Sequence, residues 1–251
     1  DLIIILGCRL NIRQISYNWK SFAKNAYKVM VDIDYSELNK PTLNINKKIN
    51  KNLKSFLPNL AKYIRSKNYK PIFYHLKFLK WCKERVKKYP VIQDSYYENK
   101  KQLNPYVFLK ELFSLINKNA NVVTANGSAC VMTFQVVEIV KQRLFTNSGS
   151  ASMGFELPAS IGACLADKKK NTICIAGDGS IMMNIQELQT IIGYKLPIKI
   201  FILNNNGYAS ILQTQKNYFS DNLNGTNSSN GVSFPNFIKL AKGFGLCSFK
   251  I

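Results

Sequence analysis

The stretch of residues 176–208 reads AGDGSIMMNIQELQTIIGYKLPIKIFILNNNGY and joins a Gly-Asp-Gly turn to a run of three asparagines. Each polar turn follows a short apolar run, TICIA at 172–176 before the first turn and IKIFIL at 198–203 before the second. Short apolar runs bounded by turn residues predict buried strands, and residues 184–192, which end at Gly193, predict a helix between them. The stretch is therefore a strand–helix–strand unit with one carboxylate and a cluster of amides at its two strand ends.

Further strands and helices are predicted on both sides of this unit. Because the strands alternate with helices, we predict an α/β fold of doubly wound parallel sheets with helices on both faces. Composition at 220–236, which is rich in Asn, Ser and Gly, favours a flexible loop over a lid that orders on a ligand. The expected strands are 2–6, 27–33, 121–125 and the start of one at 247–251, and the expected helices are 49–64, 74–88, 106–117, 158–166 and 237–244.

Ligands of such sheets bind beyond the carboxyl ends of the strands. Three polar turns are expected at that edge, at residues 126–128, 177–180 and 204–208. We therefore expect the functional site where these three turns meet.

Composition excludes several kinds of protein. No apolar run approaches the roughly 20 residues that a membrane-spanning helix needs. Six scattered cysteines without a CxxC pair fit reduced thiols in the cytoplasm better than a disulfide scaffold. His75 is the only histidine, so a His-rich zinc site is excluded, and a Ser-His-Asp triad would have to include this residue. Any metal is therefore expected to be a hard cation held by oxygen atoms.

The net charge of +21 raises the question of nucleic-acid binding. Most of the basic residues lie at 47–101, where the pattern indicates helix and linker surface, and no stacking aromatic platform accompanies them. Lys, Asn and Ile are abundant together throughout the chain, as an AT-rich coding sequence would produce. We therefore interpret the charge as a solvated surface and expect neither a nucleic acid nor a membrane as a partner.

The Gly-Asp-Gly turn has the residue types of an anion-binding turn. Gly177 and Gly179 allow a ligand to approach the backbone closely, and N–H groups at a helix start attract anions. Asp178 would repel an anion directly, but it can hold a divalent cation that bridges the two. Asn205 can add an amide oxygen and Gly207 a backbone carbonyl, and diphosphate oxygens would complete the octahedral shell of Mg²⁺. Taken alone, the Gly-Asp-Gly sequence would indicate only a tight turn, and the run of asparagines would indicate only low-complexity sequence.

Together, the two turns resemble the thiamine-diphosphate motif of the thiamine-diphosphate-dependent enzyme superfamily, in which GDG and NN each follow a strand; here Asn205 stands 27 positions after Asp178. The acetolactate-synthase-like branch is the most similar. The segments DLIIILGCRL and YKVMVDIDYSELNKPTL resemble its central domain. The segments WCKERVKKYPV and NPYVFLKEL resemble its linker and the entry to its pyrophosphate-binding domain. SMGFELPASIGA resembles its Met-Gly segment, and NNNGYASILQTQKNYF resembles its metal-ligand loop and the helix that follows.

The resemblance implies three parts of the chain. Residues 1–66 would be the C-terminal half of a Rossmann-like central domain, 67–104 a linker with a basic helix, and 105–251 the pyrophosphate-binding domain with its C-terminus truncated. The chain is therefore expected to be a piece of a longer enzyme. On its own, the chain should bind the cofactor weakly and show no catalytic turnover.

The resemblance also implies a role for residues of the turns. Asp178, the side chain of Asn205 and the main-chain oxygen of Gly207 would bind Mg²⁺. Gly179 and Ser180 would donate backbone N–H groups to the diphosphate. The cofactor site would comprise Asn126, Gly127, Ser128, Ser152, Met153, Gly154, Gly177, Asp178, Gly179, Ser180, Asn205, Gly207 and Tyr208.

Within this set, Asn126, Gly127 and Ser128 match the loop that touches the diphosphate. Met153 matches the apolar residue beneath the thiazolium that keeps the cofactor bent, and ordinary core packing is the alternative for this residue. In the family, the glutamate that activates the cofactor comes from the N-terminal pyrimidine-binding domain of a partner subunit. No catalytic residue is therefore expected in this chain, and a homodimer or homotetramer with the active site at the subunit interface is expected.

The implied activity is decarboxylation or carboligation of 2-oxo acids, with acetolactate and CO₂ from two pyruvates as the best single assignment. Acetolactate synthases carry a tryptophan where Thr214 stands, so another carboligase or decarboxylase of a specialised pathway is the alternative. Their flavin domain carries DDR where this chain has Asn-Ile-Arg at 11–13, which leaves FAD binding open. Two alternatives come from other classes of protein. One is a non-catalytic basic α/β binding protein. The other is a nicotinamide-binding protein, which we rank last because no strand leads into a GxGxxG motif.

Overall fold

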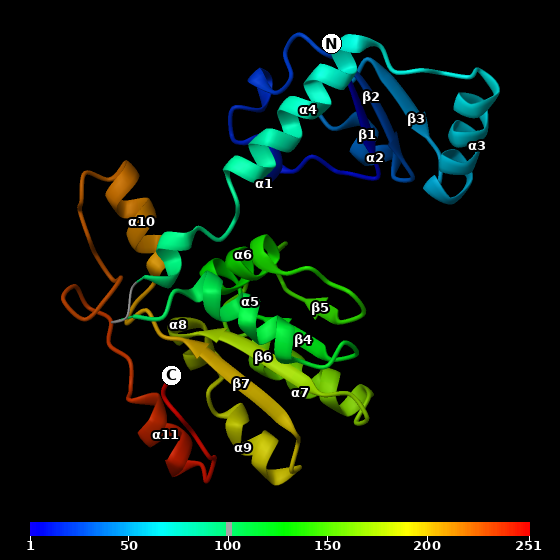
Figure 1. Cartoon of the computed structure of the whole chain (residues 1–251). Helices are drawn as coiled ribbons and strands as arrows, with labels where there is room; N and C mark the ends of the chain where they lie inside the picture. Colours follow the sequence, from blue (N-terminus) through cyan, green and yellow to red (C-terminus); the bar gives the residue numbers. More distant parts are fainter. Residues whose placement is uncertain (99–101) are drawn as a thin grey trace. The chain divides into compact units, whose positions relative to one another are not determined.

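The structure, a computed structural model, describes residues 1–98 and 102–251, and the chain divides into two compact units, Asp1–Glu84 and Arg85–Ile251 (Figure 1). The division lies inside the predicted linker 67–104, of which residues 99–101 lie outside the described residues. Among the helices described, none is both long and apolar enough to cross a membrane.

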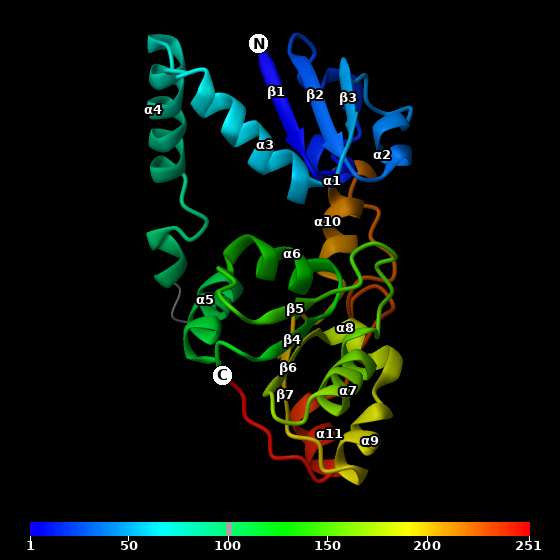
Figure 2. The same cartoon turned by 90° about the vertical axis from the view of Figure 1, so that its right-hand side faces the viewer.

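The unit Asp1–Glu84 contains a three-stranded parallel sheet of strand order β1-β2-β3 (Figure 2). Its core includes the buried side chains of Ile5, Met30 and Leu38. The elements up to the helix that crosses the division are β1 (Leu2–Leu6), α1 (Ile12–Ile15), η1 (Trp19–Ser21), β2 (Tyr27–Asp32), α2 (Tyr35–Asn39), β3 (Lys47–Asn50), α3 (Leu53–Ser66) and α4 (Phe73–Lys88).

The unit Arg85–Ile251 contains a four-stranded parallel sheet of strand order β5-β4-β6-β7. Because β6 lies between β4 and β7, the strands predicted at 172–176 and 198–203 are direct neighbours. The elements are η2 (Asp94–Tyr97), α5 (Pro105–Leu115), β4 (Asn121–Thr124), α6 (Gly127–Val136), β5 (Arg143–Phe145), α7 (Glu156–Ala166), β6 (Thr172–Gly177), α8 (Asp178–Ile181), η3 (Met182–Asn184), α9 (Glu187–Gly193), β7 (Ile198–Leu203), α10 (Ala209–Tyr218) and α11 (Phe237–Gly243).

Apolar side chains are buried on both faces of this second sheet, which is why its strands read as continuous apolar runs. Along β6, Ile173 and Ile175 pack in one cluster with Leu109 of α5. Cys174 and Ala176 point to the opposite face and pack with residues of α7 and α9. Figure 1 shows α5 and α6 on one side of the sheet and α9 on the other. The predicted doubly wound α/β fold with helices on both faces is therefore confirmed.

The helix predicted at 49–64 is wrong in its first turn. Ile49 belongs to β3, where it lies opposite Val31 of β2. Asn52 then caps α3, since its side-chain oxygen accepts a hydrogen bond from the Lys54 N–H at 2.9 Å, and the helix begins at Leu53. Helical spacing of apolar residues could not reveal that Ile49 has a strand neighbour elsewhere in the chain.

Three further differences lie in the unit Arg85–Ile251. No strand is formed at 247–251, because these residues pair with no strand of the described sheets. The helix predicted at 184–192 is α9, which begins at Glu187 after the short helices α8 and η3. The sequence patterns do not predict α6 or β5, since GSACVMTFQV lacks a helical period and RLF is only 3 residues long.

Gly162 lies inside α7 on its exposed side, where a Cβ atom would meet nothing within 4 Å. Gly162→Ala should raise the free energy of unfolding by about 0.5–1 kcal/mol, because alanine loses less backbone entropy in a helix than glycine does. Urea denaturation followed by far-UV circular dichroism measures this change. A loss of stability would show that another surface covers this side of α7.

Candidate functional site

Asp178 and the turn after β7 lie side by side in the structure. The parallel register of β6 and β7 pairs Gly177 with Leu203, so the residues after each strand leave the sheet at the same edge. Asp178 is 2% exposed, and its Oδ2 accepts a hydrogen bond from the Gly207 N–H at 3.1 Å. Its Oδ1 accepts from the Gly179 N–H at 2.7 Å. The carboxylate is thus the point at which the two predicted turns meet.

Backbone N–H groups stabilise this buried anion. Burial raises the pKa of Asp178, and the N–H groups of Gly207 and Gly179 oppose the rise. Among residues 1–98 and 102–251, none forms an ion pair with Asp178, and no three His, Cys, Asp or Glu side chains are grouped for a metal. Asn205 is exposed at the same turn. One carboxylate with nearby amide and carbonyl oxygens suits a hard divalent cation.

Tyr208 and two glycines keep the turns in close contact. A Cβ atom at Gly179 would lie 2.1 Å from Cε1 of Tyr208, so the aromatic ring lies directly on the backbone of the Gly-Asp-Gly turn. A Cβ atom at Gly207 would lie 2.3 Å from the backbone oxygen of Thr226. Both distances are far below van der Waals contact, so a larger residue at either glycine would push the neighbouring segment away.

The Asn-rich segment that composition assigns to a flexible loop packs against the turn after β7. Gly207 forms an isolated antiparallel bridge with Asn227, and the Tyr208 N–H donates to the Thr226 oxygen at 2.8 Å. Thr226 is fully buried, and its N–H donates to the side-chain oxygen of Asn230 at 2.7 Å. The structure therefore shows a hydrogen-bonded loop, since asparagine side chains supply partners to its backbone. A cavity of about 280 Å³ beside it is lined by Asn205, Asn206, Gly207, Tyr208, Ala209, Leu212, Thr226, Asn227, Ser228 and Ser229.

The third predicted turn begins α6. Asn126 precedes this helix, and its side-chain amide donates a hydrogen bond to the Ala151 oxygen. Gly127 has a φ of +60°, a conformation that favours glycine. The hydroxyls of Ser128 and Ser210 lie 3.3 Å apart, which joins α6 to the start of α10. The turn therefore contacts both the segment before α7 and the helix after the Asn run.

The Met-Gly segment before α7 packs on α8 and η3. The Gly154 N–H donates to Ser180 Oγ, and the Gly154 oxygen accepts from Asn184 Nδ2, both at 2.9 Å. Met153 is 36% exposed, and Ser152 is exposed as well. The structure thus brings the predicted turns to one edge of the sheet, while the roles of their residues in binding stay predictions.

Sequence reasoning missed three residues of this region: Glu156, Asn184 and Thr226. Glu156 is 0% exposed at the first position of α7, where an acidic residue usually indicates an exposed contact with the helix dipole. Its signal in the sequence is a charged residue within the otherwise apolar and small-residue run FELPASIGA. Asn184 and Thr226 carry no signal, because these residue types are common on any surface.

The buried Glu156 gives stability a pH dependence with a definite sign. Burial raises the pKa of Glu156, while hydrogen bonds from its own backbone and from Ser180 lower it. The folded protein binds the proton of the Glu156 carboxyl more tightly than the unfolded chain does. The resulting contribution to the free energy of unfolding is therefore fully present below the ordinary pKa of 4.5, and it is lost as the pH rises through the folded-state pKa. Glu156→Gln cannot ionise, so its unfolding free energy relative to wild type should increase as the pH rises above the ordinary value of 4.5. Urea denaturation at several pH values measures this difference, and parallel profiles would contradict it.

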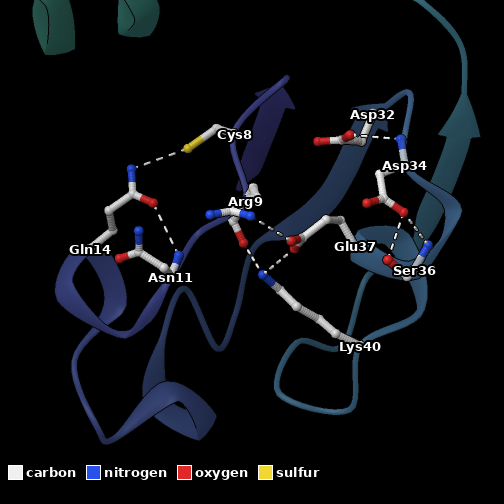
Figure 3. A network of polar contacts seen from close by, with 9 residues as sticks. All are labelled: Cys8, Arg9, Asn11, Gln14, Asp32, Asp34, Ser36, Glu37 and Lys40. Atoms are coloured by element: carbon white, nitrogen blue, oxygen red, sulfur yellow. Dashed lines mark hydrogen bonds and ion pairs between the residues drawn. The ribbon is translucent and has the colours of Figure 1, made fainter. Parts of the chain in front are cut away.

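Polar side chains also gather in the unit Asp1–Glu84, near the ends of β1 and β2 (Figure 3). Glu37 pairs with Arg9 at 3.6 Å and with Lys40 at 3.0 Å. The Asn-Ile-Arg stretch at 11–13 lies here too, and its first N–H donates to Gln14 Oε1 at 3.1 Å. These contacts lie within the unit, and FAD binding stays a prediction.

Residues 125–251 match the family model of the thiamine pyrophosphate enzyme C-terminal TPP-binding domain. The chain is 34% identical over 256 residues to the acetolactate synthase large subunit of Cyanidium caldarium, which covers 100% of this chain. It is 30% identical over 250 residues to the acetolactate synthase isozyme 1 large subunit of Escherichia coli (strain K12), which covers 98% of this chain. In both cases the aligned part is 42% of the relative, so the chain spans about two fifths of the length of these curated relatives.

The match and the geometry concern the same residues. Every residue of the predicted cofactor site, from Asn126 to Tyr208, lies inside the matched domain. That domain contains β6 and β7 with the two motif halves at their carboxyl ends. The chain therefore belongs to the thiamine-diphosphate-dependent enzyme family, in its acetolactate-synthase-like branch.

Proposed function

We propose that this chain is part of a thiamine-diphosphate- and Mg²⁺-dependent enzyme that decarboxylates a 2-oxo acid and joins the product to a second carbonyl compound. For the whole protein, we propose formation of acetolactate and CO₂ from two pyruvates, which the names of the relatives support. The observation that carries the proposal is the hydrogen bond of 3.1 Å between the Gly207 N–H and the Asp178 carboxylate, which joins the two motif halves at one edge of the sheet.

The residues present fit the cofactor. Asp178, Asn205 and Gly207 would hold Mg²⁺ through a carboxylate, an amide and a carbonyl oxygen. The diphosphate would lie against the turns at 126–128 and 177–180, where glycine backbone allows close approach. The buried Asp178 supports this fit, because a cation would neutralise a carboxylate that has no ionic partner among the described residues.

When bound, thiamine diphosphate supplies the carbon nucleophile that attacks the 2-oxo acid, and the chain binds and orients it. The exposed Met153 would contact the thiazolium ring and favour the bent form of the cofactor. We propose that the activating glutamate comes from the N-terminal domain of a partner subunit in a homodimer or homotetramer. The six free cysteines support a reducing, cytoplasmic location.

Calorimetric titration of thiamine diphosphate into the chain tests this proposal. With Mg²⁺ we expect binding, and with EDTA we expect the affinity to fall at least ~10-fold, because the cation links the diphosphate to Asp178. Inorganic pyrophosphate should show the same dependence on Mg²⁺. Affinity that is indifferent to EDTA, together with salt-sensitive binding of DNA or RNA, would instead identify a basic α/β binding protein without catalysis.

Thr214 favours a second candidate, another thiamine-diphosphate-dependent carboligase or decarboxylase of a specialised pathway. It lies in α10, and its hydroxyl donates to the Ser210 oxygen at 3.0 Å. Threonine is much smaller than the tryptophan of acetolactate synthases at this place, so a pocket lined by it would accept a different second substrate. Product analysis of the whole protein with pyruvate alone separates the two: acetolactate supports the first candidate, and another product or none supports the second.

A further inference from the structure

A buried glutamate links two segments that the proposed function places around the cofactor. Glu156 Oε2 accepts a hydrogen bond from Ser180 Oγ at 2.9 Å. Ser180 Oγ in turn accepts from the Gly154 N–H, also at 2.9 Å. These three groups join the start of α7, the helix α8 and the Met-Gly segment, and we call them the Glu156 relay.

The chemistry of serine sets the direction of this relay. A hydroxyl has one hydrogen, which Ser180 gives to Glu156, and its lone pairs are then available to the Gly154 N–H. Ser180 is 5% exposed, and its hydroxyl makes these two hydrogen bonds inside the protein. The diphosphate contact proposed for Ser180 would therefore use its backbone N–H.

Gly154 is held from a second side as well. Its oxygen accepts from Asn184 Nδ2 at 2.9 Å, and a Cβ atom here would lie 2.7 Å from both Asn184 Nδ2 and Met183 Cβ. Its φ is +81°, which favours glycine. The neighbouring Met153 is presented outward at 36% exposure. Without the relay, the Gly154 N–H would lose its partner on α8, and the position of Met153 would be less well defined.

Stability does not explain a glutamate at this place. Glu156 is 0% exposed, and within residues 1–98 and 102–251 its Oε1 has no hydrogen-bond partner. A buried polar atom without a partner destabilises a fold, and an apolar side chain would pack here without that loss. What the carboxyl adds is the acceptor that orients the Ser180 hydroxyl.

We infer that Glu156 is a positioning residue for the cofactor: through Ser180 it holds the segment of Met153 and Gly154 against α8, so that the support for the thiazolium ring and the diphosphate turn keep one geometry. The inference rests on the proposed function and deepens it. Glu156 acts through Ser180 and is not a catalytic residue.

The test compares two ligands of the same site, Mg²⁺–thiamine diphosphate and Mg²⁺–pyrophosphate, by calorimetry on the full chain. Pyrophosphate has no thiazolium ring, so its affinity should not depend on the Met-Gly segment. Glu156→Ala and Ser180→Ala should each weaken thiamine diphosphate at least ~10-fold and pyrophosphate less than ~3-fold, and the double variant should be no weaker than the single ones. Glu156→Gln should restore most of the affinity, because its amide oxygen can accept the same hydrogen bond.

Ser160→Ala is the matched control, because Ser160 is also buried in α7 and its hydroxyl donates to the Glu156 main-chain oxygen at 2.6 Å. It should leave the ratio of the two affinities unchanged. Equal weakening of both ligands, or of neither, in Glu156→Ala and Ser180→Ala would overturn the positioning role, as would the same change of ratio in Ser160→Ala. If Glu156→Ala does not fold, Ser180→Ala decides, since it breaks the same relay by removing one oxygen atom. A wild-type chain that binds neither ligand with Mg²⁺ would reject the proposed function, and the inference with it.

Discussion

Asp178→Ala should remove the Mg²⁺ dependence of thiamine diphosphate binding and lower the affinity on the order of 100-fold or more. The carboxylate supplies the charge of the proposed metal site, and Asp178 is 2% exposed. Calorimetric titrations with Mg²⁺ and with EDTA measure the effect. In the variant, the two titrations should coincide.

Asp167→Ala is the matched control for this experiment. The Asp167 side chain is 40% exposed at the end of α7 and pairs with Lys170 at 3.5 Å. Its removal changes the net charge by the same amount and leaves the site intact, so the affinity should stay within about twofold of wild type. If Asp178→Ala keeps the wild-type affinity and the wild-type response to EDTA, then Asp178 holds no metal and the proposed function is wrong.

Gly207→Ala should weaken both the fold and cofactor binding. Its Cβ atom would lie 2.3 Å from the Thr226 oxygen, a backbone atom that no side-chain rotation can move. The loop would have to shift, which would strain the hydrogen bond of 2.8 Å from the Tyr208 N–H to that oxygen and displace the Gly207 carbonyl. We expect a loss of about 1–3 kcal/mol in the free energy of unfolding. We also expect at least a ~10-fold loss of affinity for Mg²⁺–thiamine diphosphate.

Gly193→Ala offers the comparison, because Gly193 ends α9 and a Cβ atom there would meet nothing within 4 Å. This variant should change the free energy of unfolding by less than ~0.5 kcal/mol and leave the affinity unchanged. Urea denaturation and calorimetry on both variants provide the two measurements. Wild-type stability together with wild-type affinity in Gly207→Ala would contradict the packing of the Asn-rich loop on this glycine.

Local patterns predicted the part of the fold that carries the site. The apolar runs of β6 and β7 are predicted as strands because turn residues bound them, and a helix between them favours a parallel pair. Since parallel strands end at the same edge, the meeting of Asp178 with the turn of Gly207 follows once β6 and β7 are neighbours, and the tertiary structure shows that they are. Where prediction failed, a partner distant in the sequence decided the outcome: Ile49 fits a helical period but pairs with Val31 in a sheet.

The sequence by itself determined the α/β class, the three polar turns and the residue types gathered there, because these depend on apolar runs and on order along the chain. Only the tertiary structure decided that Glu156 is buried beneath Ser180, that Asn184 holds Gly154, and that the Asn-rich loop closes over Gly207. The physical reason is that burial and hydrogen-bond partners arise when elements from different parts of the chain pack together, and no local pattern contains that information.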